Sequence, residues 1–359
     1  MKLSICFTVY NQIDILEKQL HDLHDSNSSD IEVVISDDCS TDDIKKCVDS
    51  FDDNRFRYFR TPKNLGHDLN ILHAIDHASY DFVAVFRTKD NIKINNIDKI
   101  LTELDKNKST GYFLFSADYE DRMRLSFVDR IYNIGEETCY AHFYLPEHPS
   151  GNIYRKEYLD TDLYKKYIEN YFDDIYGFSV HSLIRCDLSR KACFMTSSLV
   201  GWTYYDTLGK KERAVNSTAN GKNVYSPEYC IKRFICQFSF IKQEISENQV
   251  LYLKKSIKQH YSFILGRSIT ISNDERYCSH YDSQRVKYNR KIIAKELDKV
   301  LSDLICDYQV DTRKELTKYS KSIKRKYIYA YPIKEALRNL LLKTPVYTVY
   351  KTNKSKKKL

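Results

Sequence analysis

Two adjacent carboxylates, Asp37 and Asp38, follow the β-branched run Val33, Val34 and Ile35 after a single serine. A short apolar run of this kind is typical of a buried strand. In open α/β sheets, ligands bind beyond the carboxyl ends of the parallel strands, so acids at this point have the geometry of a binding site. The same pair could instead cap the next helix, because Asp accepts hydrogen bonds from the first amides of a helix.

The surrounding pattern predicts alternating strands and helices. Apolar runs of strand length alternate with segments whose apolar residues recur at helical spacing. This alternation favours an α/β fold with a mostly parallel sheet and helices on both faces. The expected strands are Leu3–Tyr10, Ile31–Ile35, Phe56–Phe59 and Phe82–Phe86, and the expected helices are Ile13–Leu23, Asp42–Phe51 and Asp68–Ala78.

Three motifs follow one another in the N-terminal half: Ser4–Asn11, Ser36–Asp43 and Lys63–His67. Together they resemble the family 2 glycosyltransferases, which have the Rossmann-like GT-A fold. The resemblance covers residues 1–205 and implies a nucleotide-sugar transferase domain there. The family usually has glycine at the position of Cys39.

By this resemblance, Thr8, Tyr10 and Asp38 hold the nucleoside of the donor. The chemistry fits, because a carboxylate can accept a hydrogen bond from a uracil N–H and an aromatic ring can stack on the base. Gly66 would let the backbone turn tightly or pass close to a ligand.

The family normally carries an Asp-x-Asp element after the fourth strand, which binds Mg²⁺ or Mn²⁺ on the diphosphate. Here Arg87 and Lys89 occupy the expected acidic positions, and Asp90 is the acid that remains. These metals prefer oxygen ligands, whereas Arg and Lys would repel a metal and could neutralise the diphosphate directly. The sequence therefore predicts reduced metal dependence. The alternatives are a shifted alignment with Asp90 as the metal ligand, and a loss of catalysis.

Two residues are predicted to face the acceptor. Arg155 ends a segment that resembles the family's Gly-x-x-x-Arg segment, and it could meet a phosphate or a charge of the acceptor. Trp202 could offer a flat apolar face to a sugar ring. The ordinary alternatives are a surface arginine and a core tryptophan.

Inverting transfer needs a general base that takes the proton of the acceptor hydroxyl. In the family, an Asp in a Glu-Asp pair at a helix start commonly supplies it, and residues 160–190 contain no such pair. His181 stands at the corresponding place in the order and suits proton transfer near neutral pH. Asp173 and Asp174 compete with it, because paired acids can raise one another's pKa. A buried histidine and helix-capping acids are the ordinary alternatives.

The positive charge of the chain is concentrated at its C-terminal end. The 359 residues carry a formal net charge of +8, whereas residues 321–359 alone contain twelve Lys or Arg and one acid. Ile333, Leu337 and Leu340 form an apolar stripe among these cations, and tyrosines flank it. A basic amphipathic helix of this kind is typical of an anionic membrane surface. A nucleic-acid partner is not expected, because no nucleic-acid-binding motif accompanies the basic residues.

The sequence predicts four parts: a transferase domain at 1–205, a linker or lid at 206–223, a helical subdomain at 224–320 and a membrane-contacting tail at 321–359. No apolar run is long enough to span a membrane, and the N-terminus shows no signal peptide. The ten scattered cysteines fit a reducing compartment. The expected location is the cytoplasm, peripherally on the inner face of the cell membrane.

These features predict an inverting glycosyltransferase of bacterial surface-polysaccharide synthesis. The expected donor is a nucleotide-diphosphate sugar, with UDP as the nucleotide, and the expected acceptor is a lipid-linked or surface glycan. The alternative is a catalytically degenerate nucleotide-sugar-binding subunit of a membrane glycan assembly complex. Arg87, Lys89 and the missing Glu-Asp pair favour this alternative.

Overall fold

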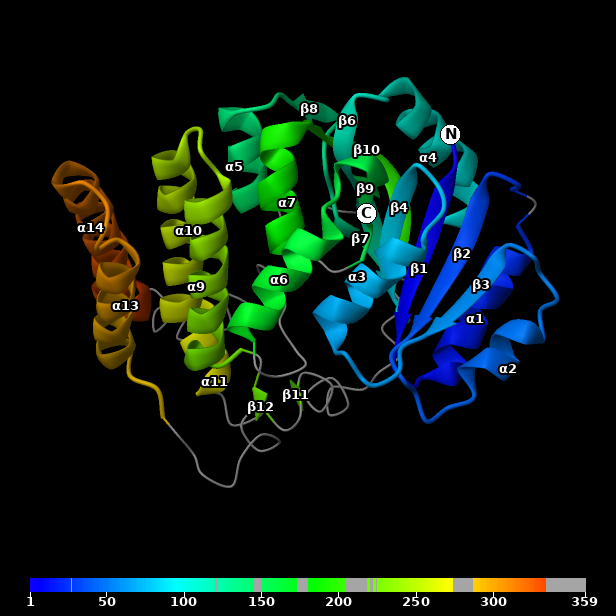
Figure 1. The fold of residues 1–359 in the computed structure, drawn as a ribbon, viewed down its shortest axis with the longest axis horizontal. Helices are drawn as coiled ribbons and strands as arrows, with labels where there is room; N and C mark the ends of the chain where they lie inside the picture. Colours follow the sequence, from blue (N-terminus) through cyan, green and yellow to red (C-terminus); the bar gives the residue numbers. More distant parts are fainter. Residues whose placement is uncertain are drawn as a thin grey trace, which may run out of the picture. The chain divides into compact units, whose positions relative to one another are not determined.

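A mixed sheet of ten strands organises the first compact unit of the computed structural model (Figure 1). The structure describes residues 1–26, 28–119, 122–144, 150–172, 180–204, 218–219, 222–223, 225–273 and 287–333. The first unit comprises Met1–Val224 and Ile235–Tyr252, and the second comprises Tyr225–Phe234 and Leu253–Leu359.

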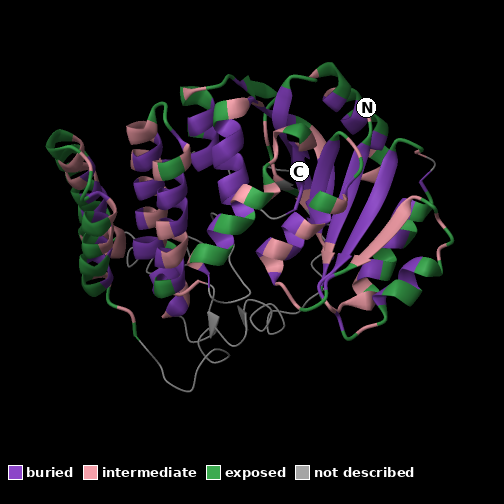
Figure 2. Cartoon of the chain, viewed as in Figure 1, coloured by how far each residue is buried: buried purple, intermediate pink, exposed green. Residues whose placement is uncertain are grey.

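The N-terminal strands form the parallel half of the sheet, in the order β3-β2-β1-β4. Their bounds are β1 (Leu3–Val9), β2 (Ile31–Asp37), β3 (Phe56–Arg60) and β4 (Phe82–Arg87). Figure 2 shows β1, β2 and β4 buried along most of their length. Helices cover both faces of a parallel sheet, so its strands are buried on both sides and consist of continuous apolar runs. The structure thus confirms the predicted α/β class.

The other half of the sheet is mixed, and its order continues β9-β6-β10-β5. Strand β9 runs antiparallel to both β4 and β6, whereas β6 and β10 run parallel to each other. The bounds are β5 (Asp90–Ile92), β6 (Thr110–Tyr119), β7 (Arg122–Leu125), β8 (Arg130–Tyr132), β9 (Asn152–Arg155) and β10 (Cys193–Tyr204).

Helices cover both faces of the parallel half. On one face, apolar residues of α1 (Ile13–His24), α2 (Ile44–Asp49) and α4 (Ile97–Lys106) join those of β1, β2 and β4 in a single buried core. On the other face, α3 (His67–His77) packs against β1 and β2. Around the mixed half lie α5 (Glu136–Tyr144), α6 (Thr161–Tyr171) and α7 (Val180–Lys191).

The C-terminal region is helical, as the sequence predicts. Its main helices are α9 (Pro227–Glu244), α10 (Gln249–Ser262), α13 (Arg290–Leu304) and α14 (Val310–Arg325). None of the helices within the described residues is long and apolar enough to cross a membrane. Of the predicted membrane-contacting tail, residues 321–333 are described, and the rest lies outside the described residues.

Gly151 offers a direct test of how Trp202 is packed in the mixed half of the sheet. Its backbone has φ of +79°, and a Cβ there would collide with the indole of Trp202. Gly135 also has a positive φ, of +111°, but a Cβ there would meet nothing within 4 Å. Both alanine variants carry the strain of a left-handed backbone, but only Gly151→Ala adds the collision with the indole. Gly151→Ala should therefore lose about 1–3 kcal/mol more unfolding free energy than Gly135→Ala. Urea unfolding measures the difference, and equal losses would contradict the packing described.

Candidate active site

The carboxyl ends of β1, β2 and β4 meet at one edge of the sheet. Val9 is paired with Asp37, and Thr8 is paired with Arg87. The register therefore brings together three of the predicted donor-site residues, Thr8, Asp38 and Arg87, although their positions in the chain are far apart. This edge is the place where an open α/β sheet binds ligands.

Asp38 fixes the backbone of the loop that precedes α3. Its carboxylate, which is 3% exposed, accepts hydrogen bonds from the amides of Leu65 at 2.6 Å and Gly66 at 2.8 Å. The hydroxyl of Thr61 adds a third hydrogen bond at 3.2 Å. Burial raises the pKa of Asp38, and the hydrogen bonds from Leu65 and Gly66 oppose that shift. Gly66 has φ of +83° as it leads into α3, so a glycine suits this turn.

Asp37 has a different role, which the sequence did not reveal. It is fully buried and accepts hydrogen bonds from the Tyr58 hydroxyl at 2.6 Å and from Arg60 at 2.8 Å. Cys39, two residues after Asp37, has φ of +60°. This left-handed conformation explains why a glycine is usual at that position in the family that the sequence resembles.

The loop after β1 is tied to the loop after β2. The Asn11 amide donates to the Ser40 hydroxyl at 2.8 Å, and the Thr41 amide donates to the Asn11 side chain at 2.9 Å. Tyr10, just before this clamp, is 45% exposed. Its ring is therefore accessible at the edge where a planar base could stack.

The end of β4 carries a partly buried ion pair, in which only the acid is fully buried. Asp90 is 1% exposed, and its Oδ2 atom accepts hydrogen bonds from Arg87 Nε at 2.8 Å and from the Ser150 hydroxyl at 2.6 Å. Arg87 Nη2 lies 2.7 Å from the same oxygen. Burial raises the pKa of Asp90, and the charge of Arg87 opposes that shift. Lys89 lies between the two in the sequence and is half-buried.

This arrangement does not fit a divalent metal of the Mg²⁺ or Mn²⁺ type. The Oδ2 atom of Asp90 is already bound by Arg87 and Ser150. Of the two carboxylate oxygens, only Oδ1 has no hydrogen-bond partner among the described residues. Such metals take about six oxygen ligands, and a guanidinium next to the acid repels them. Within the described residues, no group of three or more His, Cys, Asp or Glu could hold a metal.

His181, the first candidate for the base, lies at the start of α7 in a buried position. Its Nδ1 atom is 2.7 Å from the Tyr154 hydroxyl, and the residue is 8% exposed. Burial, assisted by the nearby His67, lowers the pKa of His181 to about 3. It is thus neutral at physiological pH, but its affinity for a proton is low. The competing acids, Asp173 and Asp174, lie outside the described residues, so the identity of the base stays a prediction.

The two predicted acceptor residues do not join the group at the carboxyl edge. Because β9 is antiparallel to β4, Arg155 lies beside Phe82 at the amino end of β4, where it pairs with Glu157. Trp202 is 1% exposed, and its indole nitrogen donates to the Phe115 carbonyl at 3.2 Å. It is packed against Phe86 in the core, so its faces are not available to a sugar in this structure.

Comparison with known proteins identifies the domain that carries this edge. The model of the family described as glycosyl transferase family 2 matches residues 4–162, which include the loop clamp, Asp38, Gly66 and the Arg87–Asp90 pair. Residues 4–162 are a family 2 glycosyltransferase domain. The predicted family is therefore confirmed.

Two curated relatives and one solved structure show how far the likeness extends. Abequosyltransferase RfbV of Salmonella typhimurium is 29% identical over 145 residues, which is 37% of this chain and 44% of that protein. The GalNAc(5)-diNAcBac-PP-undecaprenol beta-1,3-glucosyltransferase of Campylobacter jejuni is 30% identical over 114 residues, 31% of this chain and 36% of that protein. The chain thus matches less than half the length of either relative.

The likeness of the fold extends beyond the family 2 domain. The crystal structure of S. aureus TarS 1–349 with UDP-GlcNAc covers 93% of this chain, and the match spans 92% of that chain. The TM-score is 0.63 at 16% sequence identity, a likeness that shows the fold alone. It confirms the predicted GT-A fold followed by a helical C-terminal region.

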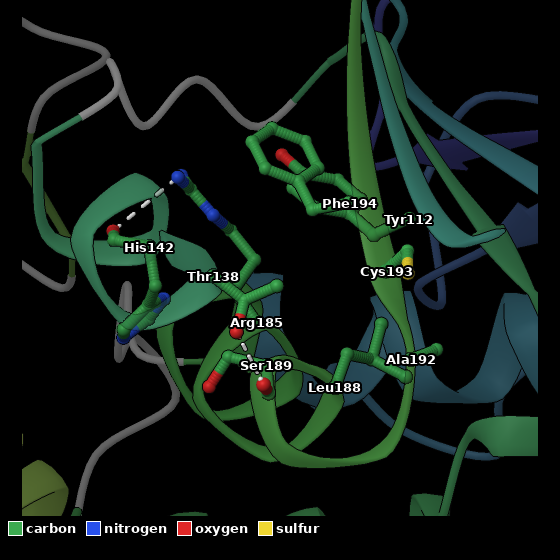
Figure 3. Close-up of a pocket in the computed structure, with 9 residues that line it drawn as sticks. All are labelled: Tyr112, Thr138, His142, Arg185, Leu188, Ser189, Ala192, Cys193 and Phe194. Atoms are coloured by element: carbon green, nitrogen blue, oxygen red, sulfur yellow. Dashed lines mark hydrogen bonds between the residues drawn. The ribbon is translucent and has the colours of Figure 1, made fainter. Parts of the chain in front are cut away.

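A small cavity elsewhere in this unit lies away from the predicted donor site. It has a volume of about 10 Å³, roughly the space of one water molecule, and lies beside Arg185 (Figure 3). Tyr112 and Cys193, which line it, belong to the amino ends of β6 and β10. These two strands run parallel to β4, so the cavity faces the edge of the sheet opposite to Asp38 and Asp90.

Sequence reasoning missed two residues that support the site, Arg60 and Ser150, and did not reveal the structural role of Asp37. Arg60 binds both Asp37 and the Ser40 carbonyl, which holds the turn after β2. Ser150 accepts a hydrogen bond from the Arg87 amide at 3.0 Å and donates to Asp90, so it orients the end of β4. A possible signal was the Ser150-Gly151 pair, because Gly151 marks a turn next to an apolar strand.

The buried His181 predicts a specific pH dependence of stability in the first unit. Its folded pKa of about 3 lies below the ordinary histidine pKa of 6.5, so the unfolded chain binds a proton first as the pH falls. Its contribution to stability should therefore be intact above pH 6.5 and decline by about 1.4 kcal/mol per pH unit towards pH 3.

Urea unfolding between pH 7 and pH 4 measures this slope. The variant His181→Gln should show a slope smaller by one proton, whatever its absolute stability. Exchange of the exposed His21 for Gln is the matched control. An unchanged slope in His181→Gln would show that His181 is not buried in the neutral form.

Proposed function

We propose that the chain transfers a sugar, with inversion, from a UDP-linked donor to a lipid-linked glycan at a membrane surface. The single observation that carries the proposal is the shaped carboxyl edge of a family 2 domain, where Asp38 holds the loop at Leu65 and Gly66 beside the ends of β1 and β4. The UDP-GlcNAc in the TarS structure and the undecaprenol-linked substrate in the name of the Campylobacter relative support the choice of substrates.

In the proposed reaction, one bond to the anomeric carbon forms while another breaks. An acceptor hydroxyl oxygen attacks the anomeric carbon, the bond from that carbon to the phosphate oxygen breaks, and the nucleoside diphosphate leaves with the bonding electrons. A base takes the hydroxyl proton. In this proposal Tyr10 and the Asp38 loop hold the nucleoside, Arg87 faces the leaving diphosphate, and the base is one of His181, Asp173 and Asp174.

A second candidate function is a nucleotide-sugar-binding subunit that lacks catalysis. Two observations favour it: the Arg87–Asp90 ion pair at the place of the family's metal-binding acids, and the low proton affinity of the buried His181. Both functions require the same donor pocket, so turnover distinguishes them. Transfer of labelled sugar from a panel of nucleotide sugars to extracted membrane lipids supports the enzyme, and binding without transfer or donor hydrolysis supports the subunit.

The donor pocket is tested by Asp38→Asn. Loss of a charge-assisted acceptor for the amides of Leu65 and Gly66 costs about 1.5–3 kcal/mol and frees the loop. We expect the variant to bind UDP at least about tenfold more weakly in calorimetry, a change of roughly 1.4 kcal/mol. Asp49→Asn, at an exposed acid of α2, is the control and should bind as the unmodified chain does. Unchanged binding in Asp38→Asn would exclude Asp38 from the pocket.

The proposed membrane contact rests on the basic C-terminal end. Exposed cations already begin on α14 with Lys314, Lys318 and Lys321, and the sequence continues with the lysine-rich terminus. Truncation after residue 320 would remove the buried Ile323 and the ion pair between Lys324 and Asp298, so it would disturb the fold as well. Substitutions in the full chain are therefore the better test.

Replacement of Lys356, Lys357 and Lys358 by Gln should reduce sedimentation with anionic phosphatidylserine vesicles. Each lysine near such a surface contributes about 1 kcal/mol, so the partition coefficient should fall by at least tenfold. Replacement of Lys45, Lys106 and Lys108, which are exposed in the first unit, removes the same charge and should have little effect. Equal sedimentation of both variants would reject docking through the tail.

A further inference from the structure

We infer that Arg87 is a built-in counter-ion for the donor diphosphate and that Asp90 positions it, in place of a divalent metal. The inference rests on the proposed function, because it assigns the diphosphate end of the same donor site. It goes beyond that function because it states how the negative charge of the leaving group is balanced.

The first argument is the orientation of the Arg87 side chain. Both Nε and Nη2 of the guanidinium approach the same Asp90 oxygen, at 2.8 and 2.7 Å. Two contacts to a buried acid fix the plane of the guanidinium. The Arg87 side chain is still 36% exposed at the carboxyl edge, whereas that of Asp90 is 1% exposed. The carboxylate of the pair is thus buried, whereas the guanidinium is partly accessible to solvent.

The second argument is the support around Asp90. The Ser150 hydroxyl donates to the same carboxylate and also accepts from the Arg87 amide, so one serine holds both partners of the ion pair. Asp90 itself lies in β5, which is paired with β10, so its backbone is held in the sheet. Its acid is therefore committed to the arginine.

The third argument is the electrostatic match between the cation and its ligand. A guanidinium offers a planar set of N–H donors that suits phosphate oxygens, and it keeps its charge at any physiological pH. Arg87 is paired with Thr8 of β1, so it lies next to the strand whose end leads to Tyr10 and the nucleoside pocket. A diphosphate that extends from that pocket along the carboxyl edge would meet Arg87.

The experiment measures UDP binding by calorimetry with EDTA and with Mn²⁺, with uridine as the probe that lacks a diphosphate. For the unmodified chain we expect UDP affinities that agree within about twofold under the two conditions, since no bridging metal is needed. A requirement for Mn²⁺, with affinity at least about tenfold lower in EDTA, would overturn the inference and leave the proposed function intact. No binding of UDP, GDP or CDP under either condition would overturn the proposed function as well.

The variants separate the charge of Arg87 from its part in folding. Arg87→Gln alone would leave Asp90 as an uncompensated buried charge, so it is compared with the double variant Arg87→Gln and Asp90→Asn, in which no charge is stranded. We expect the double variant to keep its affinity for uridine but to lose at least about tenfold in UDP affinity. Lys93→Gln breaks another partly buried ion pair, with Asp118, and should change neither affinity.

The converse variant gives a second readout. Arg87→Asp with Lys89→Asp restores the acidic pattern of the family, and we expect its UDP binding to become dependent on Mn²⁺. Unchanged UDP affinity in the double variant Arg87→Gln and Asp90→Asn, with native-like circular dichroism, would overturn the role of Arg87.

Discussion

The Asp38 carboxylate is the interaction on which the donor edge depends. A carboxylate in a buried position is costly unless its oxygens receive hydrogen bonds, and here the amides of Leu65 and Gly66 supply them. The requirement is mutual, because the positive φ of Gly66 and the turn into α3 leave these amides without a helical partner. One acid thus determines where the loop lies, and the loop determines the start of α3.

Asp38 and Asp90 show two uses of a buried acid at the same edge. Asp38 is satisfied by neutral donors and shapes the backbone, whereas Asp90 is satisfied by a cation and a hydroxyl. The difference follows from the sequence after each strand: a glycine-containing loop reaches Asp38, while Arg87 stands three positions before Asp90. In the proposed function, the Asp38 side of this edge serves the nucleoside, and the Arg87 side replaces the acidic pattern that is usual in the family.

The sequence predicted the parallel half of the fold and the residues at its carboxyl edge, because apolar periodicity and strand ends are local properties. It did not predict the direction of β9, which is set by pairing with β4 and β6 and carries Arg155 to the opposite edge. Nor could it show that Trp202 is buried, since that depends on Gly151, which is distant in the chain and lacks a side chain. Such facts arise from contacts between remote segments.

A continuous support links the donor edge to the helix that carries the predicted base. The loop held by Asp38 passes directly into α3, and Asp68 in its first turn accepts a hydrogen bond from the Val180 amide at 3.2 Å. Val180 is the first residue of α7 and precedes His181. Because Asp68 is 1% exposed, the contact is shielded from water and holds the start of α7 firmly. The loop held by Asp38 and the start of α7 are therefore both tied to the first turn of α3, so a change at Asp38 should also affect the start of α7.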